Sequence, residues 1–175
     1  MKSIPKNNDI EEITKKLKDY AYNLDIDAIG IADVENELFL KASKEHQPKY
    51  ILQNAKSVIV LGKTLPRAIF KVNYHQMPLV HRLYHSIYKF LDIIAVRLSD
   101  YIETLGYYAI PIPSYIPFRI ENLEPWGLIS LKHSALAAGL GQIAKNGLLI
   151  HPKSLKDTSF LKPLLLLLNT HKDNV

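Results

Sequence analysis

The longest regular pattern in the sequence lies between Pro78 and Leu105, where apolar side chains recur every three or four residues. This is the period of an α-helix with one buried face, and Gly106 follows it as a stop signal. Runs rich in apolar and β-branched residues occur on both sides of this segment. Helices and strands therefore alternate along the chain. The sequence predicts an α/β or α+β fold, with a central sheet and helices packed on its faces.

The remaining elements are predicted from the same apolar periodicity together with the positions of glycine, proline and capping residues. Helices are expected over 8–24 and 130–138, with Ser130 as the N-cap and Gly139 ending the second helix. A partly exposed helical connection is expected over 34–54, and loops over 64–78 and 111–125. Strands are expected over 28–32, 56–63, 107–112, 147–150 and 164–168. No repeat or linker interrupts them, so residues 1–175 are predicted to form one domain.

Composition excludes several classes of function. The 175 residues include no cysteine, so disulfides, thiolate metal sites, cysteine nucleophiles and an iron–sulfur cluster held by this chain are excluded. The net charge is only +5, with acidic and basic residues interleaved, and we do not expect a nucleic-acid partner. The polar first 20 residues do not resemble a signal peptide, and five consecutive leucines near the end are too few for a membrane span. A cytoplasmic location is the expectation.

The segment from Ala137 to Gly147, AAGLGQIAKNG, offers the best candidate for binding chemistry. Glycines at 139 and 141 allow backbone conformations that other residues avoid and allow a ligand to approach the main chain. Lys145 adds a positive charge, and Asn146 can both donate and accept hydrogen bonds. The same pattern also fits a glycine-terminated helix before a strand, with a solvated lysine. It matches neither a phosphate-binding loop nor a dinucleotide fingerprint.

The longer run from Ser130 to Pro152, SLKHSALAAGLGQIAKNGLLIHP, resembles the signature of epoxyqueuosine reductases and related iron–sulfur proteins. More distantly, it resembles the corrinoid domain of reductive dehalogenases. The preceding helices and strands follow that family's order. The resemblance implies a nitroreductase-like domain with a central mixed sheet that holds cobalamin. The positions it assigns to cofactor binding are Ser130, Lys132, His133, Ala138, Gly139, Leu140, Gly141, Gln142, Lys145, Asn146, Gly147 and Leu148.

The chain also departs from the family pattern. The family continues into a cysteine-rich module that feeds electrons to the cobalt, so the resemblance implies an external iron–sulfur donor protein or domain. This chain is then expected to be a cofactor domain, a stand-alone subunit or a fragment. The family's proton-donating aspartate falls on Pro125, which leaves the neighbouring Glu124 as a substitute. Tyr115 is a second candidate proton donor, and Gln142 replaces a bulky, usually aromatic residue.

The resemblance and the departures from it leave three functions open. The first is a cobalamin-dependent reductase working with an iron–sulfur partner. The second is an FMN-dependent reductase, because the nitroreductase-like scaffold also accommodates FMN. The third is a non-catalytic corrinoid carrier or assembly module. His81 and His85 have the i, i+4 spacing of metal ligands, but no acidic residue completes a set near them, and no metal site is predicted. A homo-oligomer is compatible with the sequence.

Overall fold

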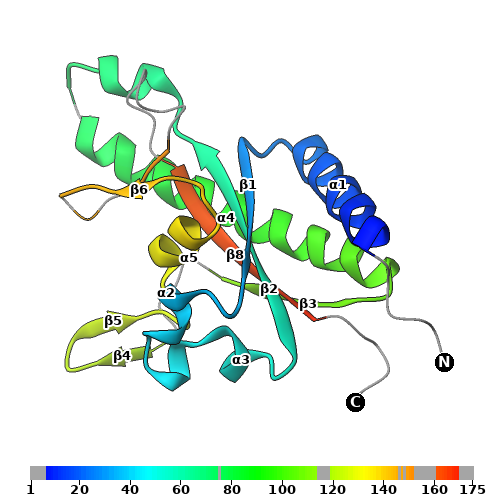
Figure 1. Ribbon diagram of the computed structural model, residues 1–175. Coiled ribbons are helices and arrows are strands. Elements are labelled where there is room, and N and C mark those ends of the chain that lie inside the picture. Colours follow the sequence, from blue (N-terminus) through cyan, green and yellow to red (C-terminus); the bar gives the residue numbers. More distant parts are fainter. Residues whose placement is uncertain are drawn as a thin grey trace.

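The computed structural model describes residues 7–74, 76–113, 119–145, 147, 149–151 and 161–169. Its main sheet has four strands in the order β1-β2-β8-β3. These are β1 (Ala28–Asp33), β2 (Ala55–Thr64), β8 (Leu161–Asn169) and β3 (Tyr108–Ile112). Helices lie on both faces of this sheet (Figure 1). The helices are α1 (Asn7–Asn23), α2 (Glu37–Leu40), α3 (Pro48–Ile51), α4 (Gln76–Thr104) and α5 (Leu131–Ala137), with 3₁₀ turns at Lys44–His46 and Arg67–Lys71.

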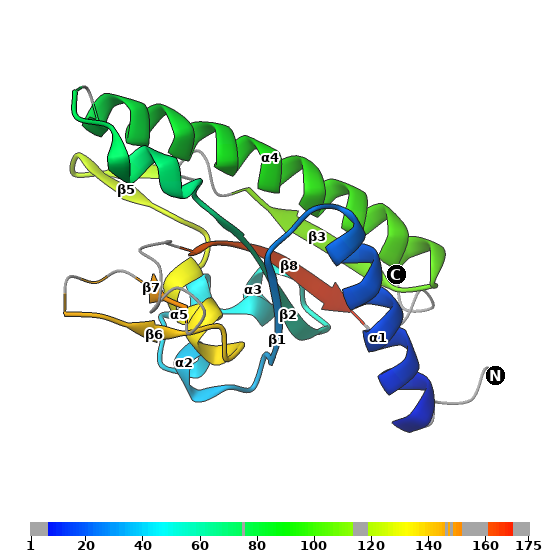
Figure 2. The same cartoon turned by 90° about the horizontal axis from the view of Figure 1, so that it is seen from above.

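The side chains of β2 point alternately to the two faces of the sheet, and this divides the core into two layers. Ile59 and Leu61 face the cluster that includes α1 and α4, whereas Val58 and Val60 face the cluster that includes α2 and α5. All four side chains are essentially inaccessible to solvent. Successive side chains of a strand point to opposite faces, so a continuous apolar run such as this one must be covered on both sides. The long helix α4 extends along one side of the sheet (Figure 2).

The sheet differs from the predicted mixed sheet. Within the described residues, β1–β2, β2–β8 and β3–β8 are all antiparallel pairs. The strands β2 and β3 run in the same direction and are connected by α4, as in a βαβ unit. However, β8 is inserted between them and is antiparallel to both. The sequence predicted β8 as the last strand, but nothing in its composition gave its place in the sheet.

The region 111–125 also differs from the predicted extended loop. A hairpin forms there from β4 (Arg119–Glu121) and β5 (Glu124–Trp126), while residues 114–118 lie outside the described part of the chain. Its two-residue turn has positive φ at Asn122 (50°) and Leu123 (66°). A turn with both central φ angles positive matches the right-handed twist of a hairpin. Asparagine tolerates this conformation, but leucine is an unusual residue for it.

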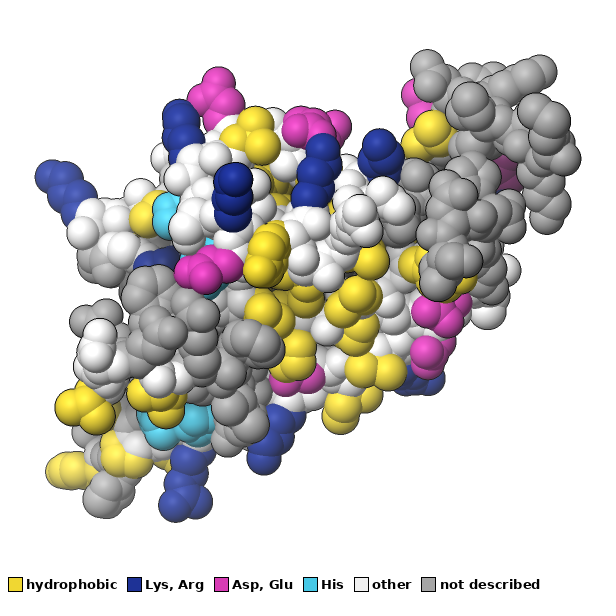
Figure 3. Space-filling model, turned by 90° about the horizontal axis from the view of Figure 1, so that it is seen from below, with side chains coloured by type: hydrophobic (Ala, Val, Ile, Leu, Met, Phe, Trp, Pro, Cys, Tyr) yellow, Lys and Arg dark blue, Asp and Glu magenta, His cyan; other side chains and the backbone are white. Residues whose placement is uncertain are grey.

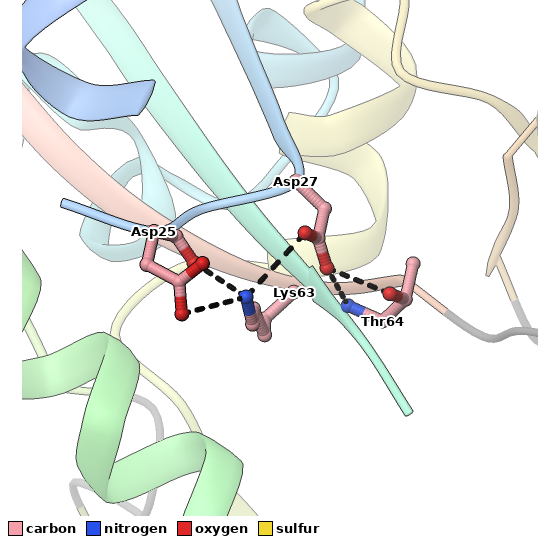
Figure 4. A network of polar contacts seen from close by, with 4 residues as sticks. All are labelled: Asp25, Asp27, Lys63 and Thr64. Atoms are coloured by element: carbon pink, nitrogen blue, oxygen red, sulfur yellow. Dashed lines mark hydrogen bonds and ion pairs between the residues drawn. The ribbon is translucent and has the colours of Figure 1, made fainter. Parts of the chain in front are cut away.

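A polar network fixes the end of β2 against the start of β1 (Figure 4). The amide and hydroxyl of Thr64 donate to Asp27 Oδ2 at 2.7 and 2.6 Å. The ammonium of Lys63 lies 3.4 Å from Asp27 Oδ1 and 3.2 Å from Asp25 Oδ2. Burial alone would raise the pKa of Asp27, but the hydrogen bonds from Thr64 and the charge of Lys63 outweigh it and hold that pKa below its usual value. The network therefore favours the ionised form of Asp27.

Hydrophobic side chains gather in the middle of the face seen from below, with most charged side chains towards its rim (Figure 3). A mainly apolar hollow of about 380 Å³ lies on the α1 and α4 side of the sheet, where Leu17 of α1 and Ile102 of α4 are among its lining residues. In the described part of the chain, no helix combines the length and hydropathy that crossing a membrane requires.

Candidate functional site

The glycine turn after α5 is built by a regular helix ending. The amide of Leu140 donates to Ala135 O at 2.9 Å, and the amide of Gly139 donates to Leu136 O at 3.0 Å. Gly139 has φ +69°. These two bonds and the left-handed residue make a Schellman motif, which satisfies carbonyl groups at the helix end. The prediction that Gly139 ends this helix is confirmed.

The turn is seated on the sheet through Gly30 of β1. A Cβ atom at Gly30 would lie 2.7 Å from Ala138 O and 2.8 Å from Leu140 Cγ, closer than real contacts allow. Glycine at this position lets Ala138 and Leu140 approach the strand backbone. Leu140 is only 7% exposed and belongs to the core on the α2 and α5 side. Its side chain therefore anchors the turn.

The outer side of the turn is open. A Cβ at Gly139 would meet no atom within 4 Å, and Gly139 itself is exposed. Gly141 is different, because a Cβ there would lie 2.2 Å from Ile150 O, where the chain returns as β7 (Leu149–Ile150). The strand β7 pairs with β6 (Gln142–Ile143) in a short hairpin. Gly139 thus faces open space, whereas Gly141 permits close backbone packing.

Two lysines lie on or beside this hairpin. Lys145 is exposed in the connection between β6 and β7. Lys132 is exposed on α5, and its Nζ would lie 3.6 Å from a Cβ placed on Gly147, which has φ +74°. Gln142 is also exposed. The fold therefore brings Lys132 of α5 against the β6–β7 connection, which also carries Lys145, and two exposed cations in this region suit a ligand carrying negative charge.

At the other end of α5, Ser130 and His133 border a hollow of about 620 Å³. Ser130 Oγ lies 2.6 Å from His133 Nδ1, a hydrogen bond in which either group can donate. Ser130 is the N-cap by position, but its side chain makes no capping bond to the helix backbone. The predicted N-cap position of Ser130 is confirmed, but its hydroxyl bonds to His133 and not to the helix backbone.

The same hollow contains residues that the sequence gave no reason to select. His46, Ser43 and Lys41 come from the α2 region and line it together with Ser130 and His133. His46 Nδ1 donates to Leu128 O at 3.0 Å, because a carbonyl oxygen can only accept. This bond places the proton of neutral His46 on Nδ1. No local pattern could have found the pairing, since the two residues are 82 positions apart.

Other predicted site residues are only partly visible. Glu124 lies in β5 and pairs through its backbone with Glu121, but its side chain is outside the described part. Tyr115, Asn146 and Leu148 lie outside the described residues altogether. Across the described ranges, no group of three or more metal-ligating side chains is gathered.

Comparison with known proteins relates this geometry to a family. No protein-family model matches the chain. The curated epoxyqueuosine reductase of Staphylococcus aureus (strain NCTC 8325 / PS 47) is 27% identical over 174 residues, covering 83% of this chain and 42% of that protein. The epoxyqueuosine reductase structure from Bacillus subtilis superposes with a TM-score of 0.59 at 17% identity, covering 91% of this chain and 46% of that one. The chain is similar to epoxyqueuosine reductases.

Two further epoxyqueuosine reductase structures support the likeness. The Streptococcus thermophilus structure has a TM-score of 0.57 at 19% identity and covers 93% of this chain and 47% of that chain. A structure determined with an epoxyqueuosine-modified tRNA-Tyr stem loop has a TM-score of 0.59 at 17% identity, covering 95% and 48%. The resemblance predicted from Ser130–Pro152 is confirmed, and the chain spans less than half the length of these epoxyqueuosine reductases. The tRNA ligand of one relative weighs against our expectation of no nucleic-acid partner.

Proposed function

We propose that this chain is the cobalamin-binding part of an epoxyqueuosine reductase-like reductase. The observation that carries the proposal is the open glycine turn at Gly139, placed on a fold that matches epoxyqueuosine reductases over 91% to 95% of this chain. Cobalamin has a broad ring and an anionic phosphate in its tail. The open turn at Gly139 suits the broad ring, and the exposed Lys132 of α5 and Lys145 of the β6–β7 connection suit the anionic tail.

On this proposal, five residues that the structure describes have distinct parts in binding cobalamin. Gly139 presents backbone to the ring, and Leu140 holds the turn on the sheet from below. Lys132 and Lys145 attract the anionic part of the ligand, and Gln142 offers a neutral polar contact at the same edge. Bound cobalamin would supply a cobalt-centred reductant, while the protein positions it and limits its contact with water.

The chain needs a source of electrons outside itself, because it has no cysteine to hold an iron–sulfur cluster. We propose a separate iron–sulfur protein or domain as the donor. The substrate to test first is epoxyqueuosine-modified tRNA, since a relative matching 95% of this chain was solved with that stem loop. Glu124 and Tyr115 are the candidate proton donors on this proposal.

Cofactor binding is tested by titrating the purified chain with cobalamin and, separately, with FMN. We expect a change in the cobalamin absorption spectrum that saturates at one equivalent, and a weaker affinity in the Lys145→Gln variant. Lys56→Gln is the matched control, because Lys56 is also exposed but lines the apolar hollow on the opposite side of the sheet. Saturable binding of FMN without cobalamin would replace this proposal with the flavin-dependent one. Binding of neither cofactor would refute both.

Catalysis is tested separately from binding. The cobalamin-loaded chain is mixed with a low-potential electron donor and epoxyqueuosine-modified tRNA, and queuosine formation is measured. Turnover supports a reductase. Stable binding with cobalt reduction but no turnover, even with a supplied iron–sulfur donor protein, favours the carrier function.

A further inference from the structure

Two histidine rings face one another on the exposed side of α4, away from the residues considered so far. His81 and His85 are one helical turn apart, and their Nε2 atoms lie 3.1 Å from each other. The rings are nearly perpendicular, with planes at 83° and centroids 4.3 Å apart. His81 is exposed and His85 is partly buried. From the sequence we predicted no metal site at this pair, because no acidic residue completes a ligand set near it. The i, i+4 spacing alone did not show that the two Nε2 atoms lie so close together.

Two imidazole nitrogens at this distance can do one of two things. One Nε2–H can donate to the other Nε2, or both nitrogens can direct lone pairs at a shared metal ion. A metal with ordinary bonds of about 2.05 Å to both nitrogens would subtend about 98° at their separation of 3.1 Å. This angle is near the right angle between neighbouring ligands of tetragonal Cu²⁺ or Ni²⁺ and below the tetrahedral angle that Zn²⁺ favours. A metal could therefore bind with little change in this separation.

Solvent reaches the pair at His81, which is exposed, whereas His85 is partly buried. Arg82 follows His81 directly, but adjacent residues of a helix do not share a face, so its charge is not held against the pair. The side chain of Arg82 is exposed. Among the residues that the structure describes, no third metal-ligating side chain joins the pair, so the proposed site has two known protein ligands and further coordination positions for water or another group.

We propose that His81 and His85 form a surface site for a nitrogen-preferring divalent transition metal, with Cu²⁺ bound most tightly. The preference for Cu²⁺ over Ni²⁺ and Zn²⁺ follows the general order of affinities for such ligands and agrees with the angle at the metal. The site is independent of the cofactor proposal, because none of its atoms belongs to α5 or the β6–β7 hairpin.

The test uses the full chain without a purification tag, titrated with Cu²⁺ and followed by calorimetry and electron paramagnetic resonance. We expect one site, with a spectrum showing two equatorial nitrogen ligands. His81→Gln should weaken that site about tenfold or more and remove one nitrogen from the spectrum, because it removes half of the protein ligands. Arg82→Gln is the control on the same helix and should bind as the wild type does.

Two results would overturn the proposal. One is a His81→Gln chain that binds Cu²⁺ as tightly as the wild type, which would place the metal elsewhere. The other is a wild-type spectrum with a single histidine nitrogen. His81 is exposed, so this variant is expected to fold, and circular dichroism checks that it does. His85→Gln provides a second variant that should give the same loss.

Discussion

Gly30 lies where the turn after α5 approaches the sheet most closely, and replacing it with alanine tests how that turn is held. The added Cβ would lie 2.7 Å from Ala138 O, 2.8 Å from Leu140 Cγ and 2.9 Å from Ala138 Cβ. Ordinary van der Waals contact begins near 3.4 Å, so the turn must move outward by about 0.5–0.7 Å. Two of the three atoms belong to Ala138, so rotation of the Leu140 side chain alone cannot relieve the contacts.

Overpacking of this kind destabilises the folded state by about 1–3 kcal/mol. The lower backbone entropy of alanine in the unfolded chain offsets part of this destabilisation. We expect Gly30→Ala to lower the free energy of unfolding by about 1–2 kcal/mol. With a urea m-value of about 2 kcal/mol per molar, the unfolding midpoint should fall by about 0.5–1 M. On the proposed function, the displaced turn should also bind cobalamin more weakly.

The matched control is Gly127→Ala. A Cβ at Gly127 would lie 3.5 Å from Ile129 O, which is ordinary contact, and Gly127 does not have a positive φ. Urea unfolding of both variants, followed by circular dichroism, gives the comparison. If Gly30→Ala unfolds at the same urea concentration as Gly127→Ala, the close seating of the turn on β1 is refuted.

Three further predictions concern other local features. Gly139→Ala should lower stability by about 1–2 kcal/mol through its left-handed φ alone, because the new methyl group meets no atom; urea unfolding at an unchanged midpoint would contradict this. Asp27→Asn should destabilise the protein at neutral pH and flatten the loss of stability on acidification. The lowered pKa of Asp27 gives stability that is present above its unfolded pKa of about 3.9 and is lost as pH falls through the lower folded value. An unchanged pH dependence between neutral pH and pH of about 2 would show that the Thr64 bonds do not favour the ionised carboxylate. Leu123→Gly should raise the melting temperature, since Leu123 is 95% exposed and has φ +66°, so glycine relieves strain worth about 1 kcal/mol with little loss of packing. A lower melting temperature would mean that the leucine side chain stabilises the hairpin.

The sequence by itself determined the elements whose signals are local. The apolar period from Pro78 to Leu105 predicted α4 to within two residues at its start, and the run around 56–63 predicted β2. Gly139 marked the end of α5, because only a left-handed residue closes a helix in that way. The run from Ser130 to Pro152 was specific enough to predict the likeness to epoxyqueuosine reductases. These signals depend on residues within one or two turns of the chain, and the spacing of such residues is read directly from the sequence without knowledge of any tertiary contact.

Tertiary structure decided the rest. The place of β8 between β2 and β3 depends on which strands it meets, and its leucines would suit any buried strand. The hairpin at 119–126 was hidden by prolines and by a turn that has leucine where glycine is usual. His46 reaches the hollow beside Ser130 only because α2 packs near α5 on one face of the sheet. Gly30 lets the turn after α5 approach β1, yet the sequence around it indicates only an ordinary glycine in a strand. Each of these depends on contacts between distant segments, whose geometry exists only once the two faces of the sheet are covered.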